Sequence, residues 1–381
     1  MIILMELYNF INNNNINNYE SLKSVLESEL FNLKIKDDID YPNLFLIHTC
    51  DNSIFSNKLV NECNGIILEK DTLKIVCYTF NKCFDSLSND LIDFDNLYTE
   101  PSLEGTLIRL YYYNDIWMLS TKKCLDSSKS KWISNKNFKE LFMECFNDYD
   151  VNNLNKSYCY SFIITHPENK IVINYTENKL FHISTRDMIS LKEIDIDIGF
   201  TKLEKKYVDK NSLETMINKI NTSTELVFEG YIFIDIHYNR FKIKSSHYNH
   251  IRELWGNTNN RLYRYIELRK DINILNEYLY YYNNDLNIFN EYENTIKKLA
   301  KFILFFYYKK NIEKENIIIP FFIKNIIYEL HGSFFKDKIK TNNVKVMLKL
   351  LEIEPKKLCF MINKYKEYKE SNNNNHINMV E

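Results

Sequence analysis

The pattern of apolar and polar positions divides the chain into regions with different textures. Residues 1–42 place apolar side chains three and four positions apart, as in MELYNFI and SLKSVLESELFNLK, which predicts a helical lead-in. Residues 43–252 carry short β-branched and aromatic runs separated by polar turns, which predicts strands and hairpins. Residues 256–365 return to helical spacing, and the polar stretch 366–381 predicts a disordered tail.

The strand-rich region predicts an α+β domain. RLYYYNDIWML indicates a hairpin around Asn114-Asp115, and NKIVINYT (169–176) is one of several further runs expected to be strands. Helical spacing appears in two inserts, 134–148 and 211–219. Because strands and helices do not alternate regularly, we expect a mixed or antiparallel sheet followed by an all-helical C-terminal domain.

Composition narrows the class of protein. The 381 residues are 45% hydrophobic and carry a formal charge of -2, which excludes a strongly basic nucleic-acid coat but not a local basic groove. No run approaches the roughly 18 apolar residues of a membrane span, and the N-terminus lacks a signal-peptide pattern. The eight cysteines form no Cys-x-x-Cys pair, so we expect buried thiols in a cytosolic protein. A single alanine, with abundant Asn, Ile, Lys and Tyr, indicates an AT-rich genome.

Two lysines stand out in FKIKS. Lys242 and Lys244 alternate along a predicted strand, so both ammonium groups project from one face. Burying either lysine alone costs several kcal/mol, so the pair either faces water on an edge strand or holds an anion.

A series of motifs resembles the bacteriophage-type ATP-dependent RNA ligases, the RNA ligase 1-like family of covalent nucleotidyltransferases. The motifs follow one another over roughly residues 45–250: Glu62-Cys63-Asn64-Gly65, Tyr78 to Phe84, Ser102-Leu103-Glu104-Gly105, Thr121-Lys122, His166 to Val172, Ser184-Thr185-Arg186-Asp187, Glu229-Gly230 and Phe241 to Ser245. The resemblance implies an ATP-grasp-like ligase domain. It also implies a reaction in which a lysine takes AMP from ATP and passes it to a 5′-phosphate RNA end, which a 3′-hydroxyl then seals.

The chain departs from that family at reacting positions. Ser102 stands where the family has the nucleophilic lysine, although the motif partners Glu104 and Gly105 are kept. Asn64 and Tyr78 replace arginines, and Ile163 replaces a glutamate that binds metal or nucleotide in the family. These changes favour a pseudoenzyme without ligase activity.

The resemblance implies a residual phosphate-binding set in which Glu229 also offers a weak metal ligand: Lys82, Lys122, Arg186, Glu229, Lys242 and Lys244. We therefore expect a protein of RNA repair or processing that binds nucleotide or RNA ends, using ATP and Mg²⁺ where a site is retained. One alternative is an active ligase with a relocated nucleophile at Lys82, Lys122 or Lys123. The other is a structural or interaction protein with a vestigial pocket. The composition and the resemblance together indicate a large DNA virus and action in the host cytoplasm, away from membranes; a protein partner stays open.

Overall fold

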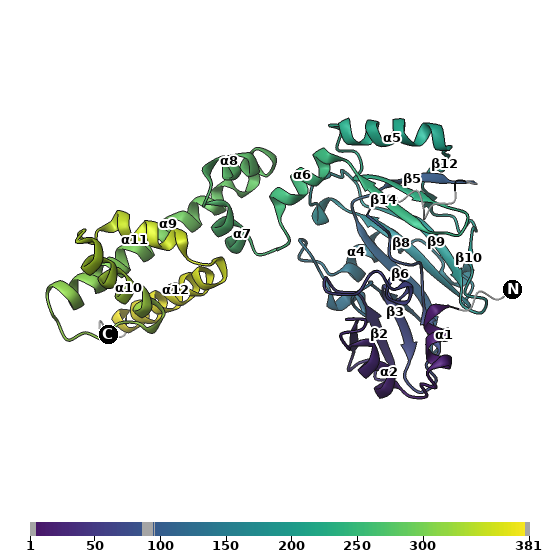
Figure 1. The fold of residues 1–381 in the computed structure, drawn as a ribbon, viewed down its shortest axis with the longest axis horizontal. Coiled ribbons are helices and arrows are strands. Elements are labelled where there is room, and N and C mark those ends of the chain that lie inside the picture. The colour runs from purple at the N-terminus through teal and green to yellow at the C-terminus, as the bar shows by residue number, and fades with distance from the viewer. Residues whose placement is uncertain (1–4, 86–93, 95, 378–381) are drawn as a thin grey trace. The chain divides into compact units, whose positions relative to one another are not determined.

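A computed structural model describes residues 5–85, 94 and 96–377 (Figure 1). The chain forms two compact units, Met1–His250 and Ile251–Glu381. The first unit holds every sequence motif discussed above. The second is helical. The expected α+β fold with antiparallel sheets and a helical C-terminal region is confirmed.

The first sheet is antiparallel and carries the N-terminal helices. Its strands lie in chain order: β1 (Lys34–Asp37), β2 (Leu44–His48), β3 (Ile66–Glu69) and β4 (Ile75–Cys77). The helices α1 (Glu6–Asn13) and α2 (Tyr19–Leu26) bury Leu7 and Leu22 in a common core with Phe45 and Ile66, and the short α3 (Lys58–Glu62) joins them. The lead-in is therefore part of the first unit.

The helical prediction for residues 1–42 is wrong at β1. Ile35 lies opposite Ile47 of β2 and is 9% exposed, while its neighbours on the strand face solvent. The alternation of Lys34, Ile35 and Lys36 suits a strand edge, and pairing with β2 decides against the helix.

The second sheet forms the middle of the first unit. It has the order β10 (Glu193–Ile194), β9 (Lys179–Asp187), β8 (Tyr158–Thr165), β6 (Thr106–Tyr113) and β7 (Ile116–Ser120), with β11 (Thr201–Lys202) running parallel to β9. The expected hairpin between β6 and β7 is confirmed, with Asn114 and Asp115 both at positive φ. The helix α4 (Phe138–Phe146), predicted within 134–148, packs Phe142 against Phe162 of β8.

The third sheet positions the candidate site. It has the order β12 (Lys206–Tyr207), β5 (Tyr98–Ser102), β13 (Gly230–Ile234) and β14 (Arg240–Lys244). The helix α5 (Lys210–Thr222), predicted within 211–219, lies along this sheet, and α6 (Ser246–Trp255) follows β14 (Figure 1). Pairing places Gly230 opposite both Ser102 and Lys244. Two motifs separated by more than a hundred residues thus meet at one end of the sheet.

The predicted strand at 169–176 is wrong. The 3₁₀ turn Pro167–Asn169 ends β8, and residues 170–176 continue as an irregular loop. The apolar Ile171, Val172 and Ile173 resemble a strand in sequence, but their N–H groups bind a side chain instead of a neighbouring strand.

The second unit contains only helices among its described residues: α7 (Arg261–Leu268), α8 (Ile272–Tyr281), α9 (Leu286–Tyr307), α10 (Phe321–Asp337), α11 (Asn343–Glu352) and α12 (Pro355–Ile377), besides 3₁₀ and π turns and the end of α6. The disordered tail expected at 366–381 is corrected over 366–377, where α12 continues; the Lys364–Glu367 ion pair lies on this helix. Residues 378–381 lie outside the described part. None of the helices described has the length and apolar character needed to cross a membrane.

Candidate functional site

Ser102 ends β5 with its side chain enclosed. The residue is 1% exposed, and its hydroxyl donates a hydrogen bond of 3.0 Å to Oε2 of Glu229. The position at which related ligases are expected to carry a lysine amine is thus a small hydroxyl, held by a carboxylate.

Glu229 is the centre of the charged cluster. Lys242 Nζ lies 3.0 Å from Oε2 of Glu229 and Lys244 Nζ lies 3.6 Å from the same oxygen. The two lysines therefore project from one face of β14, as their alternation predicted, and the anion that they hold is part of the protein. Burial opposes ionisation of Glu229, but the two lysines outweigh it and hold the pKa of the carboxyl below its usual value.

Glu104 binds the loop that follows β8. Its carboxylate accepts hydrogen bonds from the N–H groups of Ile171 (2.9 Å), Val172 (2.9 and 3.0 Å) and Ile173 (3.2 Å). These three amides are the ones that the sequence placed in a strand. The acidic residue of the motif thus serves to hold a loop.

Tyr248 of α6 joins the two carboxylates. Its hydroxyl lies 2.9 Å from Oε2 of Glu104 and 3.0 Å from Oε1 of Glu229, and the residue is 1% exposed. A tyrosine hydroxyl has one hydrogen to donate, so it cannot serve two ionised carboxylates at once. The hydroxyl therefore donates to one carboxylate at a time, and the two buried carboxylates compete for its hydrogen.

The pKa shifts distinguish the two glutamates. Burial raises the pKa of Glu104, although the N–H groups of Ile171 and Val172 oppose the shift. The pKa of Glu229 is lowered. Burial and the two neighbouring carboxylates raise the pKa of Tyr248, which keeps its hydrogen. Of the two glutamates, Glu104 is the one whose pKa is shifted toward the protonated form.

Lys122 lies beside this cluster. A Cβ built on Gly65, whose φ is +100°, would stand 3.0 Å from the Lys122 Cα, so glycine lets the two motifs meet. The Lys122 Nζ lies 4.8 Å from the centre of the Phe80 ring. Burial lowers the pKa of the amine to about 8; Cys83 opposes the shift, and the nearby Lys242 adds to it.

Lys82 and Arg186 have other partners. Lys82 Nζ lies 3.5 Å from the centre of the Phe55 ring. Two residues further along the chain, Phe84 forms an isolated β-bridge with Phe241 of β14. The Arg186 guanidinium donates to the carbonyls of Thr79 and Leu191 and to Glu193. Arg186 therefore braces neighbouring segments, and the structure does not bring it to Glu229.

The replaced positions have acquired packing roles. Tyr78 lies under the Arg186 guanidinium, with 4.2 Å between the ring centre and Cζ. The Asn64 side-chain oxygen accepts a bond of 3.4 Å from the Thr49 hydroxyl. Ile163 packs against Gly105, where a Cβ would stand 2.5 Å from the isoleucine Cγ2. None of these side chains offers a charge to a ligand.

A divalent cation does not fit the carboxylates of this cluster. Both oxygens of Glu229 are engaged by Ser102, Lys242, Lys244 and Tyr248, and both oxygens of Glu104 accept hydrogen bonds. In the described ranges no group of three His, Cys, Asp or Glu side chains is placed to hold a metal ion. The lysines, in contrast, suit a phosphate, and the weak metal role considered for Glu229 gains no support.

Comparison with known proteins gives a consistent set of relatives. The chain is 27% identical over 163 residues to the RNA ligase of Rhodothermus phage RM378, covering 33% of this chain and 37% of the relative. It is 26% identical over 159 residues to a putative RNA ligase of African swine fever virus, covering 35% of each. The chain is RNA-ligase-like.

A further relative and a solved structure are also similar to this ligase-like chain. A third relative is an immediate-early protein ICP-46 homolog of Invertebrate iridescent virus 3, 26% identical over 215 residues, covering 53% of this chain and 44% of the relative. The ligase-like chain spans less than half the length of each of these relatives, whose sources fit a viral origin. An archaeal ATP-dependent RNA ligase structure aligns over 90% of this chain and 78% of its own, at 9% identity and a TM-score of 0.41. No protein-family model matches.

Tyr248 and the amides of 171–173 are the site components that the sequence did not reveal. Tyr248 stands four residues after Lys244, but nothing in its neighbourhood marks it among 28 tyrosines. The contact that gives it a role joins residues 144 positions apart.

Proposed function

We propose that this ligase-like chain binds a phosphate-bearing ligand, a nucleotide or a 5′-phosphate RNA end, without sealing RNA. The observation that carries the proposal is the Ser102 hydroxyl, buried and hydrogen bonded to Glu229 where the resemblance implies a reactive amine. We propose that the chain acts in RNA repair or processing in a host cytoplasm.

Serine is poorly suited to replace that amine. To attack a phosphate, the Ser102 hydroxyl would have to lose its hydrogen, and the base within reach is Glu229. Lys242 and Lys244 stabilise the ionised form of Glu229 and so make it a weak base. The same ion pairs that keep the cluster intact thus work against nucleophilic chemistry at position 102.

Binding is chemically easier than reaction at this site. The side chains of Lys242 and Lys244 are 24% and 30% exposed, so a phosphate can approach them from solvent. Lys122 adds a third cation, whose charge is itself sensitive to Lys242. A phosphate would replace Glu229 as the partner of these ammonium groups.

Thermal melting with ATP, or with a short RNA bearing a 5′-phosphate, tests the binding part. A ligand that binds the native state raises the melting temperature. We expect a rise with the wild type and its loss in Lys242→Ala, whereas Lys206→Ala, at an exposed lysine paired with Glu204, should keep the rise. No rise with either ligand would favour the structural role, in which the pocket is inherited packing.

Incubation with α-labelled ATP and Mg²⁺ or Mn²⁺, followed by intact mass, tests the absence of ligase chemistry. We expect no AMP adduct on the wild type. Ser102→Lys should also stay unlabelled, because its amine would lie beside the Glu229 carboxylate and remain protonated. Labelling of that variant would show that the rest of a nucleotide pocket is competent.

A second candidate function rests on Lys122. A lysine with a pKa of about 8 is partly unprotonated near neutral pH, which a nucleophilic amine requires. In this reading the chain is an active ligase with a relocated nucleophile. An AMP adduct that disappears in Lys122→Met, but not in Lys123→Met, would establish it and overturn the proposal above.

A further inference from the structure

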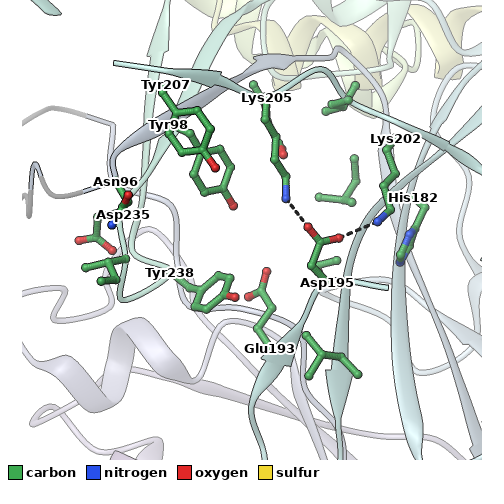
Figure 2. A pocket seen from close by; sticks show the side chains of 16 residues that line it. Asn96, Tyr98, His182, Glu193, Asp195, Lys202, Lys205, Tyr207, Asp235 and Tyr238 are labelled. Atoms are coloured by element: carbon green, nitrogen blue, oxygen red, sulfur yellow. Dashed lines mark hydrogen bonds and ion pairs between the residues drawn. The ribbon is translucent and has the colours of Figure 1, made fainter. Parts of the chain in front are cut away.

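A cavity of about 250 Å³ lies at the other end of β5 from Ser102 (Figure 2). Tyr98, at that end of the strand, pairs with Ile234, whereas Ser102 pairs with Gly230. The cavity is lined by residues of β5, β9, β10, β11 and β12 and of the loops beside them. At about 30 Å³ for each water, it has the volume of roughly eight water molecules, enough for one small flat ring system.

Glu100 is the unusual group in this cavity. It is 6% exposed and lines the cavity, and no described residue donates a hydrogen bond to its carboxylate or forms an ion pair with it. A buried carboxylate without a partner is costly, and burial accordingly raises the pKa of Glu100 to about 7. The groups that face it are Lys205 and Arg240, which lower the pKa, and Glu193 and Asp195, which raise it.

The neighbouring carboxylates already have partners. Asp195 lies 2.6 Å from both Lys202 and Lys205, as the dashed lines in Figure 2 show. Glu193 pairs with the buried Arg240. Glu100 is thus left as an open acceptor beside carboxylates that already have cationic partners.

Aromatic rings line the same cavity. Figure 2 shows Tyr98 and Tyr207 close together on one side of the cavity and Tyr238 on another. The Tyr98 and Tyr207 ring centres are 6.3 Å apart with planes inclined by 62°. Tyr207 is 75% exposed and Tyr238 is 40% exposed, so a ligand can reach both side chains from solvent. Exposed rings around a polar cavity are the usual platform for stacking a base.

We propose that this cavity is a nucleobase-binding site in which Glu100 reads the hydrogen-bonding edge of the base and the tyrosines stack on it, with guanine the preferred base. An ionised carboxylate only accepts hydrogen bonds. Guanine presents two adjacent donors, N1–H and N2–H, that match its two oxygens. Adenine presents one donor beside one acceptor and requires the protonated form of Glu100.

A cationic ligand fits this cavity less well. Lys205 already lies over the Tyr98 ring, 5.0 Å from its centre, while pairing with Asp195. The protein's own ammonium group thus fills the position that an added cation would take. What remains open is the Glu100 carboxylate, which can accept hydrogen bonds, and the tyrosine rings beside the cavity. The site does not depend on the phosphate cluster at Ser102.

Calorimetric titration of the full chain with guanosine and with adenosine tests the site directly. Guanosine should bind more tightly, and its affinity should rise as the pH increases through 7, while adenosine should show the opposite trend. Two short RNAs, each with a single guanosine or adenosine among uridines, then distinguish a free nucleoside from a base within a strand. Binding confined to the guanosine-containing RNA would assign the site to a strand.

Two variants with matched controls test the residues. Glu100→Gln offers one acceptor and one donor group, so it should abolish the preference for guanosine; Glu214→Gln, at an exposed position of α5, should keep it. Tyr207→Ala should weaken guanosine binding about tenfold, and Tyr207→Phe should not. Tyr207 is on the surface, so this pair remains informative even where Glu100→Gln fails to fold.

Equal affinity for the two nucleosides, or no binding of either nucleosides or RNAs, would overturn the nucleobase proposal. That result would leave the phosphate site untouched, because Lys242→Ala reports on it separately. Conversely, a Lys242→Ala protein that loses the rise in melting temperature with RNA but still binds guanosine would support a base site at Glu100 that is separate from the phosphate site.

Discussion

Replacing Tyr248 with phenylalanine tests whether the hydroxyl stabilises the two buried carboxylates. The ring would stay in its place, but the oxygen that lies 2.9 Å from Glu104 and 3.0 Å from Glu229 would be lost. A hydrogen bond to a charged group contributes about 1.5–3 kcal/mol, and removing it from a buried site leaves that group unsatisfied. We expect the free energy of unfolding to fall by about 2–3 kcal/mol at pH 7.

Urea denaturation followed by tryptophan fluorescence measures this loss in the first unit, which contains Tyr248. Trp117 and Trp132 belong to the first unit, and Trp255 is the remaining tryptophan of the chain. Tyr231→Phe is the matched control, because Tyr231 lies on the adjacent β13 and its hydroxyl bonds to no other described residue. Its free energy of unfolding should change by no more than about 0.5 kcal/mol.

A Tyr248→Phe protein as stable as the control would refute this reading of the cluster. It would mean that the hydroxyl carries no net stabilisation and that Glu104 and Glu229 are held well enough by the amides and the lysines.

Further predictions concern other parts of the first unit. Gly105→Ala should lower the free energy of unfolding by at least about 1–3 kcal/mol in urea denaturation, because a Cβ would stand 2.5 Å from Ile163 and from a backbone carbonyl oxygen; stability like that of the wild type would contradict the packing. Burial raises the pKa of Glu62 from 4.5 to about 7, so the folded state holds a proton that the unfolded chain releases. Stability should therefore be highest below pH 4.5 as far as this group is concerned and fall by about 3 kcal/mol as the pH rises to 7, and Glu62→Gln should flatten that decline; an unchanged slope would refute the shift. Lys122, with its pKa of about 8, should react with an amine-selective reagent at pH 8 ahead of surface lysines, which mass spectrometry of digested protein can show.

Local features of the fold could be predicted from the sequence. The β6–β7 hairpin depends on Asn114 and Asp115, which tolerate positive φ, and on strands that follow directly. The common face of Lys242 and Lys244 depends only on the two-residue repeat of a strand. Both features depend on residues that are close together in the sequence.

Features that depend on distant partners could not be predicted. The run Ile171 to Ile173 has the side chains of a strand, but Glu104 captures its amides across more than sixty positions of sequence. Ile35 belongs to a strand because Ile47 is available to pair with it. Arg186, expected near a phosphate, is instead engaged by Thr79, Leu191 and Glu193. In each case the sequence gives the residue's chemistry but not its partner.

The internal ion pairs of Glu229 give ligand binding at this cluster the character of an ion exchange. A phosphate that takes Lys242 and Lys244 leaves the buried carboxylate without the cations that keep it ionised. Its affinity for a proton must then rise, so binding a phosphate would draw a proton from solution. The heat of binding would accordingly differ between buffers of unlike ionisation enthalpy, and a heat independent of buffer would show that Glu229 keeps its charge. Phosphate binding at this cluster would therefore be coupled to proton uptake and would depend on the pH of the solution.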